Sequence, residues 1–498
     1  MTLNVWNTKS REQYERGCDR IMLNYNGYIE KLSEEAAETY ALMNPHTKEE
    51  IIRIPECRGE QMEQAISRAE DGFEKVRYMT AFERSEILDK VSQIVSGHKR
   101  IFAETVAKEA GKPMKYALGE VDRTVQTLKF SAIEARKLEG ESIPLDAAPN
   151  GAGRDAYTIF EPIGVIGAIT PFNFPLNLVV HKVGPAIAAG NAIIVKPAEK
   201  TPLSAILLRE ALVEAGLPED AYLVVTGDGP RLGEVLLNSK AIKKVTFTGS
   251  PEVGREIKSQ AGLKKVTLEL GNNSALYIDQ SQKTRVDDIA KQAVTGSFSY
   301  NGQVCISTQR IYVHEQIIDE FIDLFKQETE KLVYGDPLDE TTDLSNLIDE
   351  PSQERLLEWI EEAKQLGASV VAGSLQVEGG LEPTILKDVP REAKIYKEEA
   401  FGPVVIINTV RNSEEAINSI NHSQYGLNAG VFTNNMKQAL QFGHELNVGQ
   451  VLINDLPTLR FDHMPYGGRK NSGYGYEGVK YAIQEMVNRK MISLNYKF

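Results

Sequence analysis

The sequence is poor in the residues that build covalent and metal-bound frameworks. Only three cysteines occur in 498 residues, Cys18, Cys57 and Cys305, and they lie far apart. An odd, scattered set without a Cys-x-x-Cys pair predicts free thiols in a reducing, cytoplasmic setting. The seven histidines show no His-x-x-x-His spacing and no cluster with cysteine, so we expect no metal site.

Long apolar runs and net positive charge are also lacking. Residues 164–180 carry no charge, but two prolines and two asparagines interrupt them, which indicates a buried strand and a loop instead of a membrane span. The net charge of -14 argues against nucleic acid and membranes as partners. The first 20 residues are polar and of mixed charge, unlike a signal peptide.

The chain is too long for one hydrophobic core, which stops growing at about 250–300 residues. After a strand at 23–29, helices are predicted at about 60–75, 81–96, 98–110 and 114–138. Apolar strands then alternate with helices over 164–261, and a second such series runs over 273–455. This pattern predicts an α/β protein with doubly wound parallel sheets, in which ligands bind at the carboxyl ends of the strands.

Cys305 lies between two rigid elements. A helical pattern runs into a loop at 299–304, and a strand-like run follows at 310–314. A thiol held in this way can face a cleft and act as a nucleophile. The alternative is a small buried hydrophobe, because free cysteine is among the most buried residue types. The stretch alone leaves both interpretations open.

Two strand ends carry polar groups with a possible chemical role. Asn173 lies between Pro171 and Pro175, where a rigid amide can donate a hydrogen bond to a developing oxyanion; the alternative is an asparagine in a turn. Lys196 and Glu199 follow another strand, and the carboxylate can accept hydrogen bonds from ribose hydroxyls. The alternative for this pair is a solvated surface contact.

Two further strand ends extend this pattern. Ser250 precedes a predicted helix whose free N–H groups can hold a phosphate, unless the segment is an ordinary turn. Glu269 lies in an apolar strand, where desolvation would raise its pKa and suit it as a general base, unless the side chain reaches water. The glycines at 227, 229 and 233 miss the dinucleotide-binding spacing, so we expect no role for that loop.

Taken together, seven motifs resemble those of the aldehyde dehydrogenase superfamily in their order along the chain. They are the Asn173 loop, Lys-Pro-Ala-Glu at 196–199, Phe-Thr-Gly-Ser at 247–250, Glu-Leu-Gly at 269–271, Gly-Gln-x-Cys at 302–305, Glu-Glu-Ala-Phe-Gly-Pro at 398–403 and the glycine-rich segment 467–475. The resemblance covers about residues 23–498. It implies two Rossmann-like domains plus a small β element for oligomerisation.

The resemblance also implies a division of the chain and an assembly. The implied parts are an N-terminal extension (1–22), an NAD-binding domain (23–140 and 161–270), a catalytic domain (271–465) and oligomerisation strands (141–160 and 485–498). Subunits of such proteins typically form homodimers or homotetramers.

The implied chemistry assigns roles to three residues. The Cys305 thiolate would attack an aldehyde carbonyl, and the Asn173 amide with the Cys305 N–H would hold the oxyanion. Hydride transfer to the nicotinamide would leave a thioester, which a water activated by Glu269 would hydrolyse. Relatives that transfer the acyl group to coenzyme A usually lack this glutamate, so Glu269 favours hydrolysis. The presence of all three residues disfavours a non-catalytic protein on the same fold.

The same resemblance implies a set of cofactor contacts. The implied residues are Thr170, Phe172, Lys196, Glu199, Gly249, Ser250, Glu399 and Phe401. Lys196 and Glu199 would contact the adenosine ribose, Ser250 the pyrophosphate and Glu399 the nicotinamide ribose. Glu199 favours NAD, since it would meet the 2′-phosphate of NADP, although NADP remains possible because the carboxylate can swing away.

The substrate is indicated only by class. Residues 460–468 and 477–482 resemble a branch that includes lactaldehyde, sulfolactaldehyde, phosphonoacetaldehyde, succinate-semialdehyde and non-phosphorylating glyceraldehyde-3-phosphate dehydrogenases. Arg123, Arg460 and His463 are therefore candidates for binding a substrate anion. The alternative for each is a surface charge or an interdomain salt bridge. Three positions depart from the family pattern, namely Phe172, Asn272 and Val304, and none removes a catalytic group.

Overall fold

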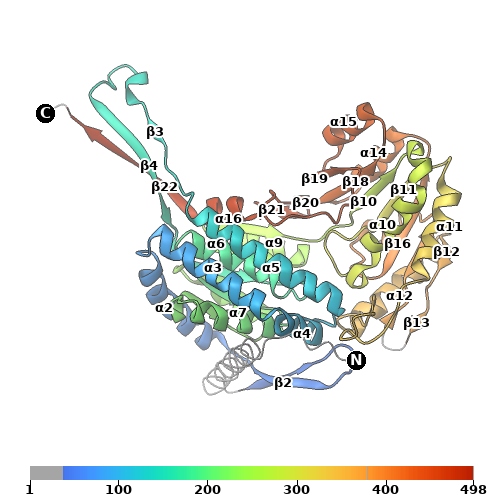
Figure 1. Ribbon diagram of the computed structural model, residues 1–498, viewed down its shortest axis with the longest axis horizontal. Coiled ribbons are helices and arrows are strands. Elements are labelled where there is room, and N and C mark those ends of the chain that lie inside the picture. The colour runs from blue at the N-terminus through green and yellow to red at the C-terminus, as the bar shows by residue number, and fades with distance from the viewer. Residues whose placement is uncertain (1–37, 378–379, 497–498) are drawn as a thin grey trace, which may run out of the picture.

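The computed structural model describes residues 38–377 and 380–496. The extension predicted at 1–22 and the strand predicted at 23–29 lie outside these residues. Two large sheets, each with its own helices, stand side by side, and a long β arm projects from the first of them (Figure 1). Among the described residues, no helix is both long and apolar enough to cross a membrane.

The first large sheet has the strand order β21-β9-β8-β5-β6-β7 and is parallel except for β21. Its strands are β5 (Val165–Ile169), β6 (Ala192–Lys196), β7 (Tyr222–Val224), β8 (Ile242–Thr248), β9 (Lys265–Glu269) and β21 (Gly473–Tyr474). In β6, Ile193 and Val195 pack into one core and Ile194 into another. The strand is apolar on both faces because successive side chains alternate and both faces are covered.

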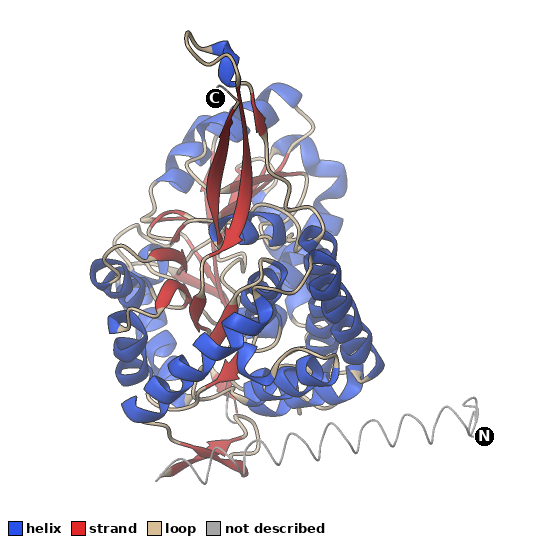
Figure 2. Cartoon of the chain, turned by 90° about the vertical axis from the view of Figure 1, so that its left-hand side faces the viewer, coloured by secondary structure: helices blue, strands red, loops and turns tan. Residues whose placement is uncertain are grey.

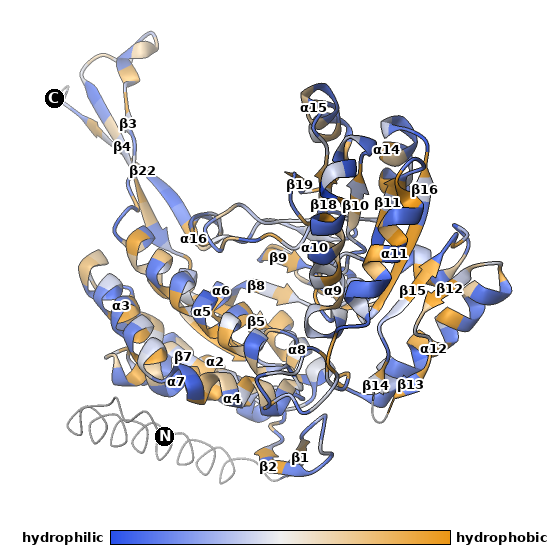
Figure 3. Ribbon diagram, turned by 45° about the vertical axis from the view of Figure 1, so that its right-hand side comes forward, coloured by the Kyte–Doolittle hydropathy of each residue, from blue (hydrophilic) through white to orange (hydrophobic). Residues whose placement is uncertain are grey.

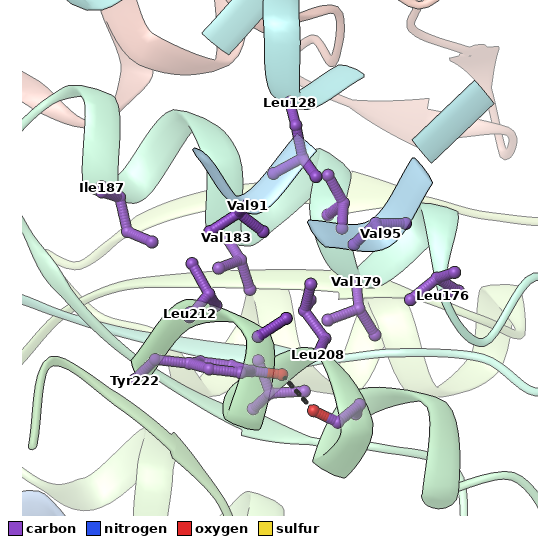
Figure 4. Packing of buried hydrophobic residues seen from close by; sticks show 14 of the residues in the cluster. Val91, Val95, Leu128, Leu176, Val179, Val183, Ile187, Leu208, Leu212 and Tyr222 are labelled. Atoms are coloured by element: carbon purple, nitrogen blue, oxygen red, sulfur yellow. Dashed lines mark hydrogen bonds between the residues drawn. The ribbon is translucent and has the colours of Figure 1, made fainter. Parts of the chain in front are cut away.

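Helices cover both faces of this sheet. They are α2 (Gly59–Val76), α3 (Ala81–Gly97), α4 (Lys99–Ala110), α5 (Met114–Ala135), α6 (Asn177–Ala188), α7 (Leu203–Glu214), α8 (Gly229–Asn238), α9 (Pro251–Gln260) and α16 (Val479–Glu485). Figure 4 shows part of the larger core, where Val91, Val183 and Leu208 lie among the buried side chains above Tyr222. The helices predicted before residue 140 are confirmed within a few residues.

The second large sheet has the order β12-β15-β16-β11-β10-β18-β19 and is parallel except for β12. Its strands are β10 (Ala275–Ile278), β11 (Arg310–His314), β12 (Ser369–Ala372), β15 (Thr384–Lys387), β16 (Val404–Val410), β18 (Asn428–Phe432) and β19 (Gln450–Ile453). Its helices are α10 (Val286–Phe298), α11 (Ile318–Thr329), α12 (Glu350–Gln365), α13 (Lys394–Lys397), α14 (Ser413–Asn421) and α15 (Met436–Glu445). Hydrophobic strands lie inside the helical layers in Figure 3. The prediction of two doubly wound parallel sheets is confirmed.

The projecting arm joins two distant parts of the chain. β22 (Val487–Asn495) pairs antiparallel with β4 (Arg154–Pro162), and β3 (Ser142–Ile143) pairs with the other edge of β4. Figure 1 shows this arm standing clear of the helices, and Figure 2 shows its long paired strands from the side that faces the viewer. β22 is thus an edge strand of the arm. The remaining short strands are β1 (Thr39–Met43), β2 (Glu50–Pro55), β13 (Gln376–Val377), β14 (Gly380–Leu381), β17 (Tyr425–Gly426) and β20 (Arg469–Lys470).

The glycine-rich segment near the C-terminus adds a strand that the sequence did not predict. In β21, Gly473 pairs with Glu269 of β9. Beside this pair, the Leu270 N–H donates to the Ser472 carbonyl at 2.9 Å, and the Ser472 hydroxyl donates to the Gly271 carbonyl at 2.8 Å. A Cβ at Gly473 would lie 2.7 Å from the Leu268 carbonyl oxygen. Glycine therefore allows the C-terminal segment to lie directly against the strand that carries Glu269.

Candidate active site

A sharp turn after α10 carries Cys305 into a cavity. Tyr300 and Asn301 have φ angles of 51° and 55°, in the left-handed region that side chains other than glycine rarely adopt. Gly302 follows with a φ of 68°, and a Cβ there would lie 2.2 Å from the Gly402 carbonyl oxygen. Three such residues in succession reverse the chain direction. Non-glycine residues in this conformation persist only where their surroundings hold them.

The surroundings of the turn supply that support. The Tyr300 hydroxyl donates to the Ala110 carbonyl at 3.0 Å, at the end of α4. The Asn301 side chain donates to the Asn346 carbonyl at 3.0 Å and accepts from the Ser345 N–H at 2.9 Å. Contacts from both halves of the chain therefore hold the turn that precedes Cys305.

Asn173 meets this turn from the other sheet. It follows β5, and its Nδ2 donates to the Gln303 carbonyl at 2.9 Å. Its Oδ1 is buried and has no hydrogen-bond partner among the described residues. A primary amide carries two N–H groups, so one remains for a ligand. The structure thus brings Asn173 to the loop of Cys305, as predicted.

Glu269 is a buried carboxyl group at the end of β9. It is 4% exposed, and neither carboxylate oxygen has a hydrogen-bond partner in the described part of the chain. Burial raises the pKa of Glu269 well above its usual range, the carboxylate of Glu477 adds to this effect, and Arg460 and Lys182 oppose it. The alternative of a glutamate that reaches water is therefore wrong. A buried carboxyl without partners is unusual and indicates a functional group.

The thiol of Cys305 has a close polar neighbour in Tyr466. Its Sγ lies 3.2 Å from the Tyr466 hydroxyl oxygen. Burial raises the pKa of the Cys305 thiol to about 11. The Cys305 carbonyl accepts a hydrogen bond of 3.0 Å from the side chain of Asn272, which also lies within 2.5 Å of the Ser274 hydroxyl. Asn272, a departure from the family pattern, therefore helps to place the cysteine.

A single cavity of about 1030 Å³ gathers the predicted cofactor residues. All of them line it together with Asn173 and Cys305: Thr170, Phe172, Lys196, Glu199, Gly249, Ser250, Glu399 and Phe401. Asp228, Gly229 and Gly233 line it as well, so the glycine loop for which we expected no role lies at the cavity. The spacing misses the dinucleotide fingerprint, but β7 still delivers the loop to the same sheet edge as its neighbours.

One end of the cavity has the donors and acceptors that a dinucleotide needs. Ser250 caps α9, accepting from the Val253 N–H at 3.4 Å, and the helix N-terminus faces the cavity. Lys196 is buried and paired with the half-exposed Glu199. A Cβ at Gly229 would lie 3.0 Å from Glu199 Oε1 and 3.2 Å from Lys196 Nζ, so glycine keeps this corner open.

Another part of the cavity lining lies near the cysteine. Glu399 Oε1 accepts from the Asn272 N–H at 2.9 Å, and burial raises the pKa of Glu399 to about 8. The rings of Phe172 and Phe401 meet edge to face, with centroids 5.7 Å apart. These residues fit the ribose and ring of a nicotinamide, with an acceptor for hydroxyl groups and apolar faces for the ring.

The candidates for anion binding lie outside the lining of this cavity. Arg123 Nη2 pairs with Asp462 Oδ1 at 2.7 Å, and the buried His181 contacts the same oxygen at 2.8 Å. Arg460 Nη2 pairs with Glu477 Oε2 at 3.0 Å. His463 is exposed and packs beside Phe130, with ring centroids 4.8 Å apart. Both arginines form salt bridges, which was the alternative interpretation of their role.

Sequence reasoning missed the charged residues behind Glu269. Lys182 Nζ donates to Thr248 Oγ1 and to Glu477 Oε1, each at 2.7 Å. Lys182 and Arg460 together hold the pKa of Glu477 well below its usual range, despite burial. A lysine within the apolar helix α6 was the available signal, since lysine is almost never buried without a partner.

A family comparison now adds to this geometry. The model of the aldehyde dehydrogenase family matches residues 32–492. The chain belongs to the aldehyde dehydrogenase family. The match spans both large sheets and the arm, and it confirms the resemblance drawn from the seven motifs.

Similar proteins of the family define the activity. A 3-sulfolactaldehyde dehydrogenase of Priestia aryabhattai is 43% identical over 95% of this chain and 98% of that protein. A lactaldehyde dehydrogenase of Methanococcus maripaludis is 39% identical over 92% of this chain and 97% of that protein. The crystal structure of a glyceraldehyde-3-phosphate dehydrogenase from Methanocaldococcus jannaschii, complexed with NADP, has a TM-score of 0.87 at 37% identity, over 92% of this chain and 100% of that one. This aldehyde dehydrogenase is an NAD(P)-dependent enzyme.

Within residues 38–377 and 380–496, no group of three or more His, Cys, Asp or Glu side chains is arranged to hold a metal ion.

Proposed function

We propose that this aldehyde dehydrogenase oxidises a short 2-hydroxy aldehyde that carries an anionic group, of the 3-sulfolactaldehyde type, to its carboxylic acid. The observation that carries the proposal is the 43% identity to a 3-sulfolactaldehyde dehydrogenase over 471 residues. The alternatives are a coenzyme A-acylating enzyme and a broad aldehyde oxidiser without preference for anions.

Cys305 is the nucleophile in this proposal. Its thiol loses a proton, and the sulfur forms a bond to the aldehyde carbon, which gives a tetrahedral thiohemiacetal. The free N–H of the Asn173 amide and the backbone N–H of Cys305 hold the oxyanion. The bond from Asn173 to the Gln303 carbonyl orients that amide before the substrate arrives.

The dinucleotide, when bound, supplies the acceptor for the hydride that leaves the former aldehyde carbon. Lys196 and Glu199 bind the adenosine ribose, and Ser250 with the α9 N-terminus binds the pyrophosphate beside Gly249. At the other end, Glu399 binds the nicotinamide ribose. Thr170, Phe172 and Phe401 flank the ring. Their common position along one cavity supports this assignment.

Glu269 is the general base that releases the product. Burial raises the pKa of Glu269, so its carboxylate is a stronger base than that of an ordinary glutamate, which suits proton transfer from water. The water attacks the thioester carbon, the carbon–sulfur bond breaks, and the acid leaves. A retained base at this position favours water over coenzyme A as the acyl acceptor.

Arg123 is the main anion contact in this proposal, with Arg460 and His463 in support. Its guanidinium carbon lies 5.8 Å from the ring centroid of Phe174, the residue after Asn173. Its contacts to Asp462 use Nη2 and Nε, and a guanidinium has five N–H donors, so an anion can still be bound. A sulfonate, phosphate or carboxylate fits a guanidinium fork equally well.

We also propose a cytoplasmic homodimer or homotetramer built through the arm. Met491 and Leu494 of β22 are 56% and 42% exposed on an edge strand. An exposed edge with apolar side chains is a surface that proteins normally cover. The domain division predicted from the sequence, at 23–140 with 161–270 and at 271–465, remains part of this proposal.

The test is initial-rate reduction of NAD and NADP with 3-sulfolactaldehyde, lactaldehyde, succinate semialdehyde, glyceraldehyde 3-phosphate and a neutral aliphatic aldehyde. We expect an anionic 2-hydroxy aldehyde to give the highest kcat/KM, and Cys305→Ser to abolish turnover. Analysis of the products with and without coenzyme A separates hydrolysis from acyl transfer. Equal rates with the neutral aliphatic aldehyde would contradict the substrate proposal, and turnover by Cys305→Ser would contradict the mechanism.

A further inference from the structure

The Tyr466 hydroxyl lies beside the sulfur of Cys305, yet no role follows for it from the family motifs. The two atoms lie 3.2 Å apart, within hydrogen-bond distance for sulfur. Tyr466 is 2% exposed and packs with Ile306 and Leu427 beside Cys305. A buried tyrosine hydroxyl normally finds a partner. Here that partner is the Cys305 thiol.

The position of this hydroxyl is fixed by its neighbours. Tyr466 and Glu477 form a two-way backbone bridge, with N–H to carbonyl distances of 3.1 and 2.6 Å. Glu477 also binds Arg460, whose guanidinium carbon lies 3.7 Å from the centroid of the Tyr466 ring. The backbone bridge and the stacked guanidinium together hold the ring. The hydroxyl therefore reaches the sulfur from a rigid support.

We propose that Tyr466 is a further catalytic residue, which donates a hydrogen bond to the Cys305 thiolate and holds it ready for attack. The inference rests on the proposed role of Cys305 as nucleophile. A thiolate has no proton, so in that state the phenol must be the donor. Hydrogen bonds to ionised acceptors are stronger than neutral ones, and the exclusion of water strengthens them further.

The charges around the thiol show why such a donor matters. Burial raises the pKa of Cys305 to about 11, and the carboxylates of Glu399 and Glu269 also raise it. The hydrogen bond from Tyr466 and the positive charge of Arg460 act in the opposite direction. Without the hydroxyl, the thiol would keep its proton to still higher pH.

The same hydrogen bond also has a cost for reactivity. A thiolate that is stabilised by a donor is intrinsically less nucleophilic than one that is not. Removing the hydroxyl should therefore have two opposite effects, because it lowers the fraction of thiolate at neutral pH but leaves each remaining thiolate more reactive. Simple damage to the fold would instead expose the buried thiol, lower its pKa and speed its alkylation at neutral pH.

The experiment measures alkylation of Cys305 by iodoacetamide from neutral to alkaline pH, with peptide mass spectrometry to identify the labelled cysteine. The variants are Tyr466→Phe and, as a matched control, Tyr474→Phe, since Tyr474 lies on the same C-terminal segment and is 53% exposed. We expect Tyr466→Phe to react about ten- to a hundredfold more slowly at neutral pH. At a pH above the midpoint of thiol ionisation in both proteins, Tyr466→Phe should react at least as fast as the wild type. The control should follow the wild-type profile.

The inference would be overturned if Tyr466→Phe leaves the pH midpoint of Cys305 ionisation unchanged. It would also be overturned if the variant lowers the alkylation rate by the same factor at every pH. Binding of NAD(P), followed by fluorescence, checks that the variant is folded. Fluorotyrosine placed at position 466 is a second variant that keeps the shape of the ring. Its phenol is more acidic and a better hydrogen-bond donor, so the midpoint of Cys305 ionisation should move to lower pH. A midpoint that does not move would count against the proposed role of Tyr466.

The two proposals fail in different ways. If Cys305→Ser still turns over aldehyde, the nucleophile is misassigned and the role of Tyr466 fails with it. If Cys305→Ser is inactive while the alkylation profile of Tyr466→Phe matches the wild type, only the inference about the tyrosine is wrong.

Discussion

On the adenosine side of the cavity, the proposed binding residues lie at the ends of parallel strands in one sheet. On the substrate side, the candidate residues come from distant segments that meet through ion pairs. Lys196 ends β6 and Glu199 follows it, while Ser250 follows β8. Arg123 lies on α5 and is paired with Asp462, which is 339 positions away in the chain. The first arrangement is a property of the sheet, while the second depends on how the C-terminal segment packs.

The difference between the adenosine side and the substrate side has a physical basis. In a parallel sheet, the carboxyl ends of successive strands lie at one edge, so the topology of the sheet alone brings together the residues that follow each strand. No such rule brings a helix on one side of the sheet to a segment more than three hundred residues later. Substrate recognition can therefore change through the C-terminal segment, while the cofactor side stays the same.

The largest effect is expected at the junction of the two regions, from Glu269→Gln. We expect kcat to fall by about a hundred- to ten-thousandfold, because general-base assistance to thioester hydrolysis is lost. The first turnover should persist as a burst of reduced cofactor, since acylation does not need this base. Stopped-flow absorbance measures both phases.

The pH dependence of the same step gives the control. Burial raises the pKa of Glu269, and a general base must be unprotonated, so wild-type turnover should increase as pH rises through that pKa. Turnover by Glu269→Gln should lack this increase. A variant that loses the burst as well would show that Glu269 acts before the thioester forms.

Arg460→Met should show that the substrate side depends on buried ion pairs. Arg460 and Glu477 are 5% and 3% exposed, so the change leaves a buried carboxylate with Lys182 as its remaining cation. We expect the free energy of unfolding to fall by about 1–3 kcal/mol. Urea denaturation followed by fluorescence measures it.

The matched control is Arg411→Met, which breaks an exposed pair with Glu415 on α14. That change should cost less than about 1 kcal/mol. Equal costs for the two variants would contradict the view that the Arg460 pair is a buried structural element.

The smallest effect is expected on the cofactor side, from Glu199→Gln. Its side chain is 47% exposed, so its repulsion of a 2′-phosphate is screened by solvent. We expect the ratio of kcat/KM for NADP to that for NAD to rise by no more than about fivefold. The relative rates with different aldehydes should not change. A large change in aldehyde preference would contradict the view that the adenosine side and the substrate side act independently.

The sequence predicted the first region better than the second for the same reason. Lys196, Glu199 and Ser250 lie at or just after strand ends that the apolar pattern marks, and all three line the same cavity. The contact of Tyr466 with Cys305 could not be predicted in this way, because it depends on a segment that pairs with a strand about two hundred positions earlier. The arginines were visible as charges, but their carboxylate partners are known only once the chain is folded.

The most direct test compares 3-sulfolactaldehyde with lactaldehyde, which differ by the sulfonate group. The ratio of their kcat/KM values should be measured for the wild type, Arg123→Met and a control, Arg136→Met, at the exposed end of α5. We predict that the wild type prefers the sulfonate, that Arg123→Met loses about ten- to a hundredfold of this preference with cofactor affinity unchanged, and that the control keeps it. If the ratio is the same in Arg123→Met and the wild type, Arg123 serves only its salt bridge with Asp462, and the account of the substrate side is wrong.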